Sequence, residues 1–433
     1  MDKRLLTLLI VLVILIPTVY WFFNQNTGWL NQKPTVKIMY PAEGTKVMNL
    51  VTMSGTAFDP EDSLVSVEVR IDDGDWISVV GTMQWSYEWN IYDASEGSYL
   101  VSVRSYDGDL YSDVVSITVQ VETPDTADSS VHKWAVFIAA ANFPEKNESK
   151  LGNGGLNLAE EMVGFFIDTY QYPASHVFVL FDDGWIRADN GYGDRVETLQ
   201  ERPHSYDITY GAATKQTVFD TLNYVIEESN QYDDSEVFIW VFNHGYGDEN
   251  NTVTGGKLLS SSWIFLWDDV ISDKDLGDAL QSLQSKKMCL IVDACYAGGF
   301  ADKTIFNMRT SLLLRSGIPK NGRIVIAGAS KFRKGYASTT EGPLFSMLWF
   351  EGLQSGDADG FRPGLLGLGK PTRFKFLQDG KVSVEEAFYY ARYTLSTDKD
   401  LKEYRSMQPQ INDRYPRRGL LLSRREMVFG VSS

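Results

Sequence analysis

From residue 133 onward, uninterrupted apolar runs alternate with segments whose apolar residues recur at helical spacing. The apolar runs cover residues 134–141, 176–181, 236–242, 287–292 and 322–329. The helical segments cover residues 156–170, 214–228 and 275–284. Strands without polar alternation are buried on both faces, and strands separated by helices are joined by parallel crossovers. The sequence therefore predicts a three-layer α/β domain with a mainly parallel sheet over residues 132–433.

Two of these strands run directly into polar, glycine-containing motifs. His244 follows the run 236–242, and Cys295 follows the run 287–292. Sites in parallel sheets form at the carboxyl ends of the strands, so neighbouring strands would bring the two side chains to one edge. A thiolate is a strong nucleophile, and a neighbouring imidazole lowers the thiol pKa or takes its proton. We therefore predict that Cys295 is a catalytic nucleophile and that His244 is its acid/base partner.

Glycines accompany both candidate catalytic residues. Gly245 directly follows His244, and Gly298 lies three residues after Cys295. Glycine lets the backbone approach a substrate closely, and backbone N–H groups at such positions stabilise an oxyanion. We expect Gly245 and Gly298 to contribute this backbone.

The remaining cysteine and histidines have ordinary explanations. Cys289 lies inside an apolar run and is expected to be a small core residue. It stands six residues from Cys295, roughly 20 Å along an extended strand, which is beyond disulfide reach. The other histidines lie in linker, strand-entry or loop settings and are interpreted as incidental: His132, His176 and His204.

Residues 34–122 have a different periodicity. Apolar residues alternate with polar ones over residues 35–39, 64–71, 99–104 and 115–121, with Gly, Asp and Pro between the runs. Asp73-Gly74 is a hairpin signal. The pattern predicts a β-sandwich of about seven strands. The stretch also resembles the immunoglobulin-like modules of microbial surface proteins, notably at residues 54–59 and 67–72.

We interpret this sandwich as a spacer, with binding of a substrate or partner as the alternative. Residues 123–131 are rich in Thr, Pro, Asp, Ala and Ser and are interpreted as the linker to the α/β domain.

Residues 1–30 are interpreted as a cytoplasmic start and a transmembrane anchor. Residues 5–23 contain no charge and would form a helix about 28 Å long, close to the hydrocarbon thickness of a bilayer. Lys3 and Arg4 precede this segment, and aromatic residues end it. A cleaved signal peptide would end in small residues, which are missing here. The sequence predicts a single-pass membrane protein with most of the chain outside the cytoplasm.

The acidic balance excludes one class of partner. The 433-residue chain has a formal net charge of −17. Binding of nucleic acid needs a basic face, so we expect no nucleic-acid partner.

The order of the motifs resembles the legumain family of caspase-fold cysteine peptidases over residues 132–415. In this resemblance, a strand ending at Asp182-Asp183 precedes the His-Gly strand, and the Asp-Ala-Cys strand follows it. The resemblance implies a caspase-like fold with the catalytic residues at His244 and Cys295. It also implies that an Asn in the loop after the first strand orients the histidine. Asn153 is the first candidate, and Asn142 is the second.

The same resemblance implies a specificity pocket. Asp293, two residues before the nucleophile, would form one wall, and the segment around Ser330 would form the other. An acidic wall favours a basic residue or Asn in the substrate. Related arginine-specific enzymes carry an Asp where this chain has Leu158, which argues against a strict basic preference.

Two Asp-Gly segments resemble the halves of an EF-hand-type calcium loop. Asp357 and Asp359 belong to the first half, and Asp379-Gly380 begins the second. Residues 361–378 separate the halves, so Asp-Gly turns followed by a helix capped near Ser383 are the alternative. Asp357 and Asp359 are the calcium candidates, and no other metal or cofactor is expected.

Three functions follow from these observations. The first is a cysteine endopeptidase acting on protein or peptide substrates outside the cytoplasm. The second is a transamidase or ligase of the same fold, in which an amine replaces water. The third is a non-catalytic surface protein that binds a partner.

Overall fold

The computed structural model describes residues 31–92, 94–122, 132–141, 143, 150–188, 202, 204–247, 261–303, 316–364, 369–415 and 426–430. These residues pack into two compact units. The predicted anchor at residues 5–23 and the predicted linker at residues 123–131 lie outside the described residues. Within the described ranges, no helix has the length and apolar character needed to cross a membrane.

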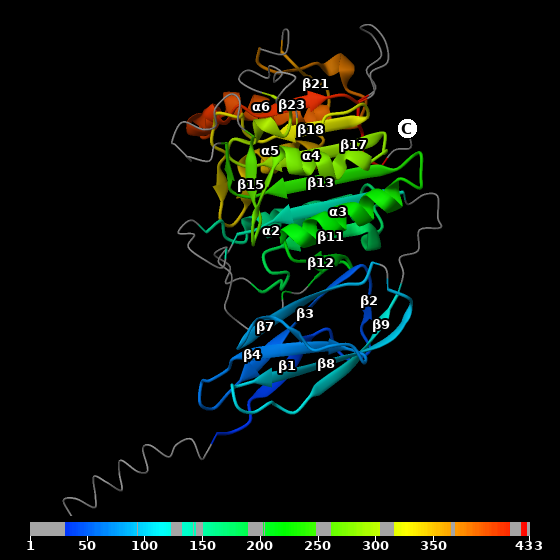
Figure 1. Ribbon diagram of the computed structural model, residues 1–433. Coiled ribbons are helices and arrows are strands. Elements are labelled where there is room, and N and C mark those ends of the chain that lie inside the picture. The colour runs from blue at the N-terminus through cyan, green and yellow to red at the C-terminus, as the bar shows by residue number, and fades with distance from the viewer. Residues whose placement is uncertain are drawn as a thin grey trace, which may run out of the picture. The chain divides into compact units, whose positions relative to one another are not determined.

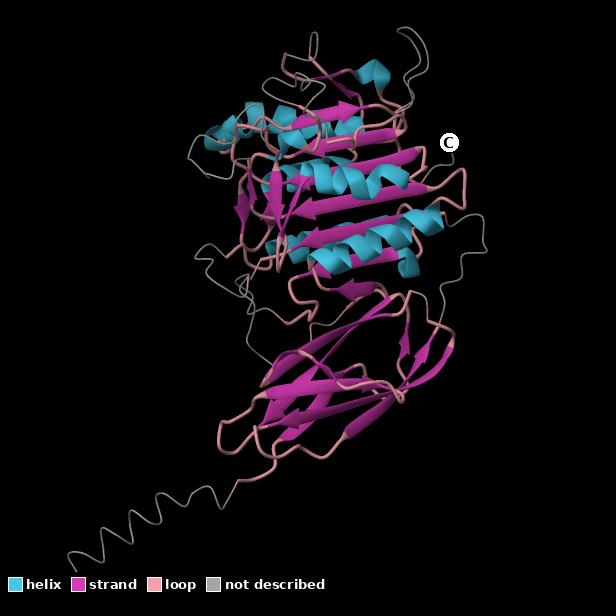
Figure 2. Cartoon of the chain, in the orientation of Figure 1, coloured by secondary structure: helices cyan, strands magenta, loops and turns pink. Residues whose placement is uncertain are grey.

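The N-terminal part of the chain is a β-sandwich (Figures 1 and 2). Its strands are β1 (Thr35–Tyr40), β2 (Lys46–Val47), β3 (Leu50–Phe58), β4 (Ser66–Ile71), β5 (Ile77–Ser78), β6 (Val80–Gly81), β7 (Gln84–Asn90), β8 (Gly97–Tyr106) and β9 (Val115–Val121). One sheet has the order β1-β3-β7-β6, and the other has the order β2-β9-β8-β4-β5. The four predicted runs correspond to β1, β4, β8 and β9, and the Asp73-Gly74 turn joins β4 to the antiparallel β5. Nine strands are described, against about seven predicted, and three of them, β2, β5 and β6, are only two residues long and too short to show periodicity.

The C-terminal part of the chain is built on a seven-stranded sheet. Its strands are β10 (Lys133–Ala139), β11 (Val177–Phe181), β12 (Thr209–Gly211), β13 (Glu236–Phe242), β17 (Lys287–Asp293), β18 (Arg323–Ala327) and β23 (Gln410–Asp413). The order is β12-β11-β10-β13-β17-β18-β23, and every neighbouring pair is parallel except β18 and β23. The predicted mainly parallel sheet is therefore confirmed.

Helices cover both faces of this sheet. They are α2 (Gly154–Asp168), α3 (Lys215–Ser229), α4 (Asp273–Ala279), α5 (Leu344–Ser355) and α6 (Val384–Thr397). Alternate side chains of β10 divide between two cores, because successive strand residues point to opposite faces. Phe137 packs in the core that contains α2, α5 and α6. Val136 and Ile138 pack in the core that contains α3 and α4, whose helices lie in front of the sheet in Figure 1. The three-layer prediction is thus confirmed.

Side-chain caps explain where several helices begin. Ser272 and Ser383 each form a capping box. The serine hydroxyl accepts a hydrogen bond from the backbone N–H of the third helical residue, and the carboxylate of that residue accepts one from the backbone N–H of the serine. Thr214 accepts from the backbone N–H of Thr217 at the start of α3. The predicted helix start near Ser383 is confirmed.

Several short elements were not predicted. They are β14 (Gly245–Tyr246), β15 (Trp263–Phe265), β16 (Val270–Ser272), β19 (Ala337–Ser338), β20 (Gly342–Pro343), β21 (Phe361–Arg362) and β22 (Thr372–Arg373). The predicted helix over residues 275–284 also differs, because α4 ends at Ala279 and a 3-10 turn follows over Leu280–Ser282. The edge strands β12 and β23 escaped prediction because they are short and, in β23, half polar.

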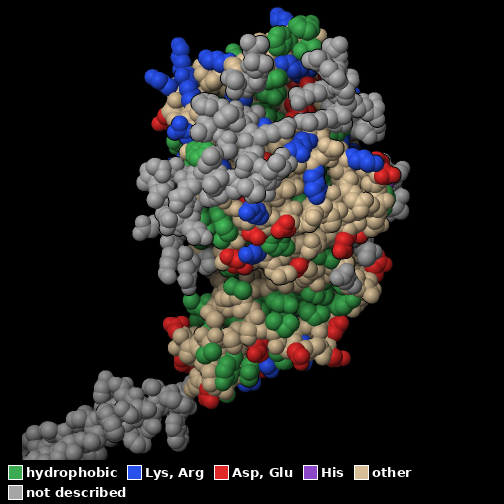
Figure 3. Space-filling model, turned by 45° about the horizontal axis from the view of Figure 1, so that its top comes forward, with side chains coloured by type: hydrophobic (Ala, Val, Ile, Leu, Met, Phe, Trp, Pro, Cys, Tyr) green, Lys and Arg blue, Asp and Glu red, His purple; other side chains and the backbone are tan. Residues whose placement is uncertain are grey.

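The acidic surplus forms no single block on the face in Figure 3. There, Asp and Glu side chains are scattered, with Lys and Arg side chains also present.

A buried ion pair fastens the amino ends of the two central strands. Glu236 and Lys287 are register partners in β13 and β17, and their side chains pair away from water. The Tyr172 hydroxyl donates to Oε1 of Glu236 at 2.6 Å, and the Gly430 N–H donates to the same atom at 3.1 Å. Glu236 therefore ties a loop and the C-terminal segment to the sheet.

We expect Lys287→Met to lower the free energy of unfolding by about 3–5 kcal/mol, because it leaves the Glu236 carboxylate buried without its cation. Urea unfolding measures this change. Lys286→Met is the matched control, since Lys286 pairs with Asp233 in an ion pair that is largely exposed. An equal loss in both variants would contradict a special role for the buried pair.

Candidate functional site

The two candidate catalytic residues leave the sheet in register. Phe242, the last residue of β13, pairs with Asp293, the last residue of β17, and the strands are parallel neighbours. His244 and Cys295 each follow two residues later. A Cβ atom on Gly245 would lie 2.3 Å from the Cys295 carbonyl oxygen, so the two backbones touch where Gly245 passes. The structure therefore brings the two motifs together at one sheet edge.

The His244 segment is held by a small antiparallel sheet of β14, β15 and β16. The Phe265 N–H donates to the His244 carbonyl oxygen at 3.0 Å, and the Asn243 amide donates to the Phe265 carbonyl oxygen at 2.6 Å. The Asn243 side-chain oxygen accepts from the His244 N–H at 2.7 Å. The imidazole lies beside the rings of Phe143 and Phe265, with centroids 6.1 and 6.4 Å away. These contacts fix the backbone that carries the imidazole.

The Cys295 thiol is half-buried and close to the segment that follows β18. Its Sγ donates to the Gly335 carbonyl oxygen at 3.7 Å. Burial raises the pKa of the Cys295 thiol, while the Gly335 backbone and the Lys334 charge act in the opposite direction. A raised pKa keeps the thiol neutral near pH 7, so nucleophilic attack would need a base to remove its proton.

The turn after Cys295 needs glycine for steric reasons. It forms a 3-10 turn over Ala297–Gly299. A Cβ atom on Gly298 would lie 2.5 Å from the Lys331 backbone nitrogen and 2.6 Å from Oε1 of Gln410. The assignment of Gly245 and Gly298 to oxyanion stabilisation stays a prediction.

Asp293 is buried beneath this edge. Its Oδ2 accepts from the backbone N–H and from the hydroxyl of Ser346, each at 2.8 Å, in the first turn of α5. The Trp240 indole donates to the same hydroxyl at 3.0 Å. Burial raises the pKa of Asp293 to about 6, against the opposing hydrogen bonds from Ser346. Asp293 thus joins β17 to α5, and its role in a specificity pocket stays a prediction.

Two predicted site residues carry buried polar atoms without partners among the described residues. Asn153 is the N-cap residue of α2, and neither its amide nitrogen nor its amide oxygen has a hydrogen-bond partner there. The same holds for the hydroxyl of Ser330, which follows β18. An unpaired buried polar group costs about 1–3 kcal/mol, and such groups call for a functional or solvent explanation. Asn142, the second orienting candidate, lies outside the described residues.

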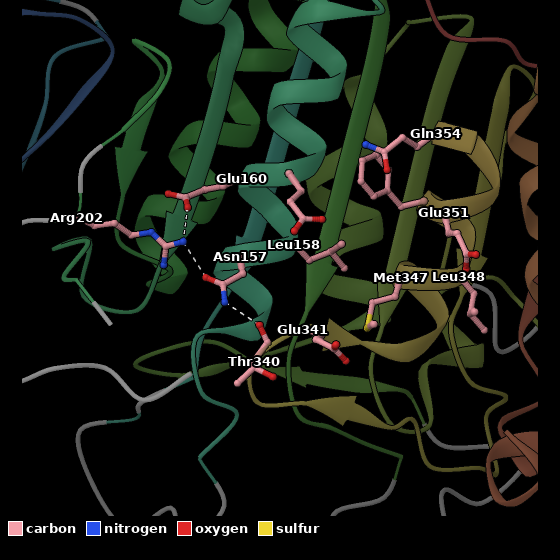
Figure 4. A pocket seen from close by; sticks show the side chains of 12 residues that line it. Asn157, Leu158, Glu160, Arg202, Thr340, Glu341, Met347, Leu348, Glu351 and Gln354 are labelled. Atoms are coloured by element: carbon pink, nitrogen blue, oxygen red, sulfur yellow. Dashed lines mark hydrogen bonds and ion pairs between the residues drawn. The ribbon is translucent and has the colours of Figure 1, made fainter. Parts of the chain in front are cut away.

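A pocket that was not predicted opens between α2, α5 and the turn between β19 and β20 (Figure 4). Its volume is about 880 Å³, and four glutamates line it together with apolar side chains: Glu160, Glu161, Glu341, Glu351, Leu158, Met347, Leu348 and Phe350. Arg202 enters it and contacts Asn157 Oδ1 at 2.8 Å and Glu160 Oε2 at 2.7 Å. Cys295, His244, Asp293 and Ser330 do not line this pocket. The adjacent glutamates on α2 were its one signal in the sequence.

The carboxylates of the two calcium candidates, Asp357 and Asp359, have other partners in the structure. The carboxylate of Asp359 accepts from the backbone N–H groups of Asp379 at 3.2 Å and Gly380 at 3.0 Å. Asp357 lies 3.9 Å from Arg373. Within the described ranges, no group of three or more His, Cys, Asp or Glu side chains is arranged to hold a metal. The two Asp-Gly segments do meet, but through backbone donors that occupy the carboxylate.

Comparison with known proteins identifies part of the chain. Residues 34–103 match the family model of a bacterial Ig domain, which confirms the predicted immunoglobulin-like module. No curated protein matches the chain.

Three solved structures are similar to parts of the chain. One is the endo-β-1,4-mannanase from Thermotoga petrophila, at 16% identity and a TM-score of 0.20, covering 23% of this chain and 22% of that one. Another is the fibronectin(III)-like modules of Clostridium thermocellum CbhA, at 28% identity and a TM-score of 0.20, covering 22% of this chain and 50% of that one. The third is caspase-1 from Spodoptera frugiperda, at 14% identity and a TM-score of 0.31, covering 55% of this chain and 74% of that one. The chain thus spans half or less of the first two structures.

We expect Asp293→Asn to change how stability depends on pH. An unfolded Asp titrates near ~3.9, whereas burial raises the folded pKa to about 6. Between these values the folded protein keeps the proton and the unfolded chain has lost it, so this carboxyl group lowers stability as the pH rises. As the pH rises from 4 to 6, the free energy of unfolding of the neutral variant should increase relative to that of the parent by up to about 3 kcal/mol, at ~1.36 kcal/mol per pKa unit. Above pH 6 the difference should stay constant. Urea unfolding of both proteins from pH 4 to 8 measures the difference, and a difference that does not vary with pH would contradict the assignment.

Proposed function

We propose that this protein is a membrane-anchored cysteine endopeptidase of the legumain type within the caspase fold. The observation that carries the proposal is the register of β13 and β17, which brings the His244 and Cys295 segments to adjacent positions at the carboxyl edge of a parallel sheet. A thiol and an imidazole on neighbouring strand ends form the constellation for thiol nucleophilic catalysis.

The proposed reaction begins with proton transfer from the Cys295 thiol to the His244 imidazole. The thiolate then attacks the scissile carbonyl carbon, and backbone N–H groups near Gly245 and Gly298 stabilise the oxyanion. Collapse of the tetrahedral intermediate breaks the C–N bond, and the imidazolium gives its proton to the leaving amine. Water activated by His244 finally hydrolyses the Cys295 thioester.

The environment of the thiol fits this sequence of steps. Because burial raises the pKa of Cys295, the resting thiol is neutral, and proton transfer to a base is part of the attack. The rings of Phe143 and Phe265 lie beside the imidazole of His244, with centroids 6.1 and 6.4 Å away.

The proposed substrate is a protein or peptide chain. The buried polar atoms of Asn153 and Ser330, which lack partners among the described residues, are the groups we assign to substrate recognition or to orientation of His244. Asp293 would contribute to the wall of a specificity pocket next to Cys295, distinct from the pocket between α2 and α5, and would be charged above its pKa of about 6. A carboxylate in that position favours a substrate side chain that donates hydrogen bonds, such as a basic residue or Asn.

The proposed location is the outer surface of a membrane. The uncharged stretch at residues 5–23, preceded by Lys3 and Arg4, supports an anchor with its amino end in the cytoplasm. The bacterial Ig domain at residues 34–103 would act as a spacer between the anchor and the peptidase domain.

We expect Cys295→Ala to abolish hydrolysis of a peptide library by the full-length protein, because the nucleophile is lost. Cys289→Ala is the matched thiol control: Cys289 is fully buried in β17, so its loss should leave cleavage intact. His244→Ala should slow cleavage by a factor on the order of 10²–10⁴, the usual contribution of general acid–base catalysis.

The library profile also reports specificity. Full activity in the Cys295→Ala variant would refute the peptidase assignment. Failure of a thiol-reactive peptide probe to label Cys295 would favour a non-catalytic binding protein.

A transamidase would form the same thioester, so it is distinguished at the second step. To distinguish a peptidase from a transamidase, an amine-terminated peptide is added during cleavage and the products are analysed by mass spectrometry. Hydrolysed product alone supports the peptidase, whereas ligated product as the main species supports the transamidase.

A further inference from the structure

The residue directly after the nucleophile has an unusual backbone conformation. Tyr296 has a φ of 60°, in the left-handed region, where a bulky side chain is disfavoured. Such conformations persist where the surrounding structure over-determines them. The contacts that hold Tyr296 are therefore candidates for contacts that position Cys295.

A single buried hydroxyl spans the turn after Cys295. Ser262 is fully buried at the start of the β15 strand, and its Oγ donates to the Tyr296 carbonyl oxygen at 2.6 Å. The same Oγ accepts from the Gly299 N–H at 3.0 Å. On the other side, the Tyr296 N–H donates to the Arg333 carbonyl oxygen at 2.8 Å. Ser262 thus closes the turn, and Arg333 fixes its first peptide unit.

Ser262 is itself held by Asp273, the first residue of α4. The Ser262 N–H donates to Asp273 Oδ2 at 2.9 Å, and the Asp273 N–H donates to the Ser262 carbonyl oxygen at 2.9 Å. A Cβ atom on Gly299 would lie 2.3 Å from Asp273 Oδ2 and 2.5 Å from Ser262 Oγ. The second glycine of the motif is therefore required by this contact.

Buried charges lie behind the pair. Burial raises the pKa of Asp273, and burial lowers the pKa of Lys331, while the attraction between their charges acts against both shifts. Asp302 also interacts with both groups, and its N–H donates to the Gly299 carbonyl oxygen at 2.9 Å. The turn after Cys295 consequently packs on buried polar side chains. If the Ser262 hydroxyl were removed, few other groups could take over its hydrogen bonds.

We infer that Ser262, anchored by Asp273, is a positioning residue for Cys295: it holds the nucleophile turn in the geometry that aligns the thiol with His244. The inference rests on the proposed function in assuming that the pair reacts, but thiol reactivity can be measured without any peptide substrate. Misplacement of a reacting group by about 1 Å costs on the order of 100-fold in rate.

The test is the rate of Cys295 alkylation by iodoacetamide as a function of pH in the full-length protein. We expect Ser262→Ala to slow alkylation at neutral pH at least tenfold and to move the pH midpoint of the reaction upward. If the protein cleaves peptides, kcat should fall by about 10- to 100-fold, with KM little changed.

Ser285→Ala is the matched control. The Ser285 hydroxyl is also buried and also donates to a backbone carbonyl oxygen, that of Ser235 at 2.6 Å, but it precedes β17 at the opposite end of the sheet. It should lower the unfolding temperature to a similar degree and leave alkylation of Cys295 unchanged.

Three outcomes overturn the inference: parental alkylation in Ser262→Ala, equal slowing in both serine variants, or a fall in rate with no change in the pH profile. Should Ser262→Ala not fold, Asp273→Asn tests the same contact in a milder form, with slowing of about two- to tenfold expected and parental reactivity overturning the inference. Slowed alkylation in a protein that cleaves no peptide would reject the peptidase and keep the positioning role.

Discussion

The pairing of β13 with β17 is the interaction on which the candidate site depends. All seven residues of each strand are paired, from Glu236 with Lys287 to Phe242 with Asp293. A shift of one residue would move one motif by about 3.3 Å along the sheet and turn its side chains to the opposite face. The buried ion pair at the amino ends and the apolar side chains between the ends both oppose such a shift. The geometry at the edge that carries the candidate site is therefore set largely by contacts far from that edge.

Close backbone contact is the second constraint, and it accounts for the glycines around Cys295. Gly245 passes within contact of the Cys295 carbonyl oxygen, and Gly299 leaves room for Asp273 and Ser262. These glycines allow close packing between segments that are distant in the sequence. Glycine adds conformational freedom to the unfolded chain, and the hydrogen bonds of Ser262 offset this cost. The glycines after the motifs thus have a packing role whether or not they bind an oxyanion.

The sequence was sufficient to predict features that arise from local pattern. Continuous apolar runs predicted the parallel strands, and the order of the strand ends predicted that His244 and Cys295 share an edge. Features that depend on contacts between distant residues were missed. Ser262 ends a run of three serines between apolar residues, and its partner Tyr296 is 34 residues away in the chain. The half-polar strand β23 takes its place at the sheet edge only through pairing with β18.

The calcium prediction shows how one local pattern fits two structures. Asp359 and the Asp379-Gly380 turn do come together, as the two halves of a cation loop would. Backbone N–H groups, however, satisfy the carboxylate of Asp359, and Arg362 neutralises the nearby Glu386. Each oxygen of the Asp359 carboxylate accepts one backbone N–H, so this carboxylate already has partners that tie the two segments together. The spacing of Asp and Gly fits both a turn that joins two segments and a cation loop, and the sequence pattern alone could not separate these two interpretations.

The raised pKa of the Cys295 thiol and the raised pKa of Asp293 have the same physical cause, which is burial. Both groups lie where water is scarce, so both favour their neutral forms. A neutral thiol resists oxidation and stray alkylation, because the thiolate is the reactive species. In the proposed mechanism, attack by Cys295 requires a base at a fixed position. The alignment of the two strand ends, rather than the acidity of the thiol, would then be the property that the fold maintains. The hydrogen bonds of Ser262 and Asn243 act on that property, since one holds the turn after Cys295 and the other holds the backbone of His244.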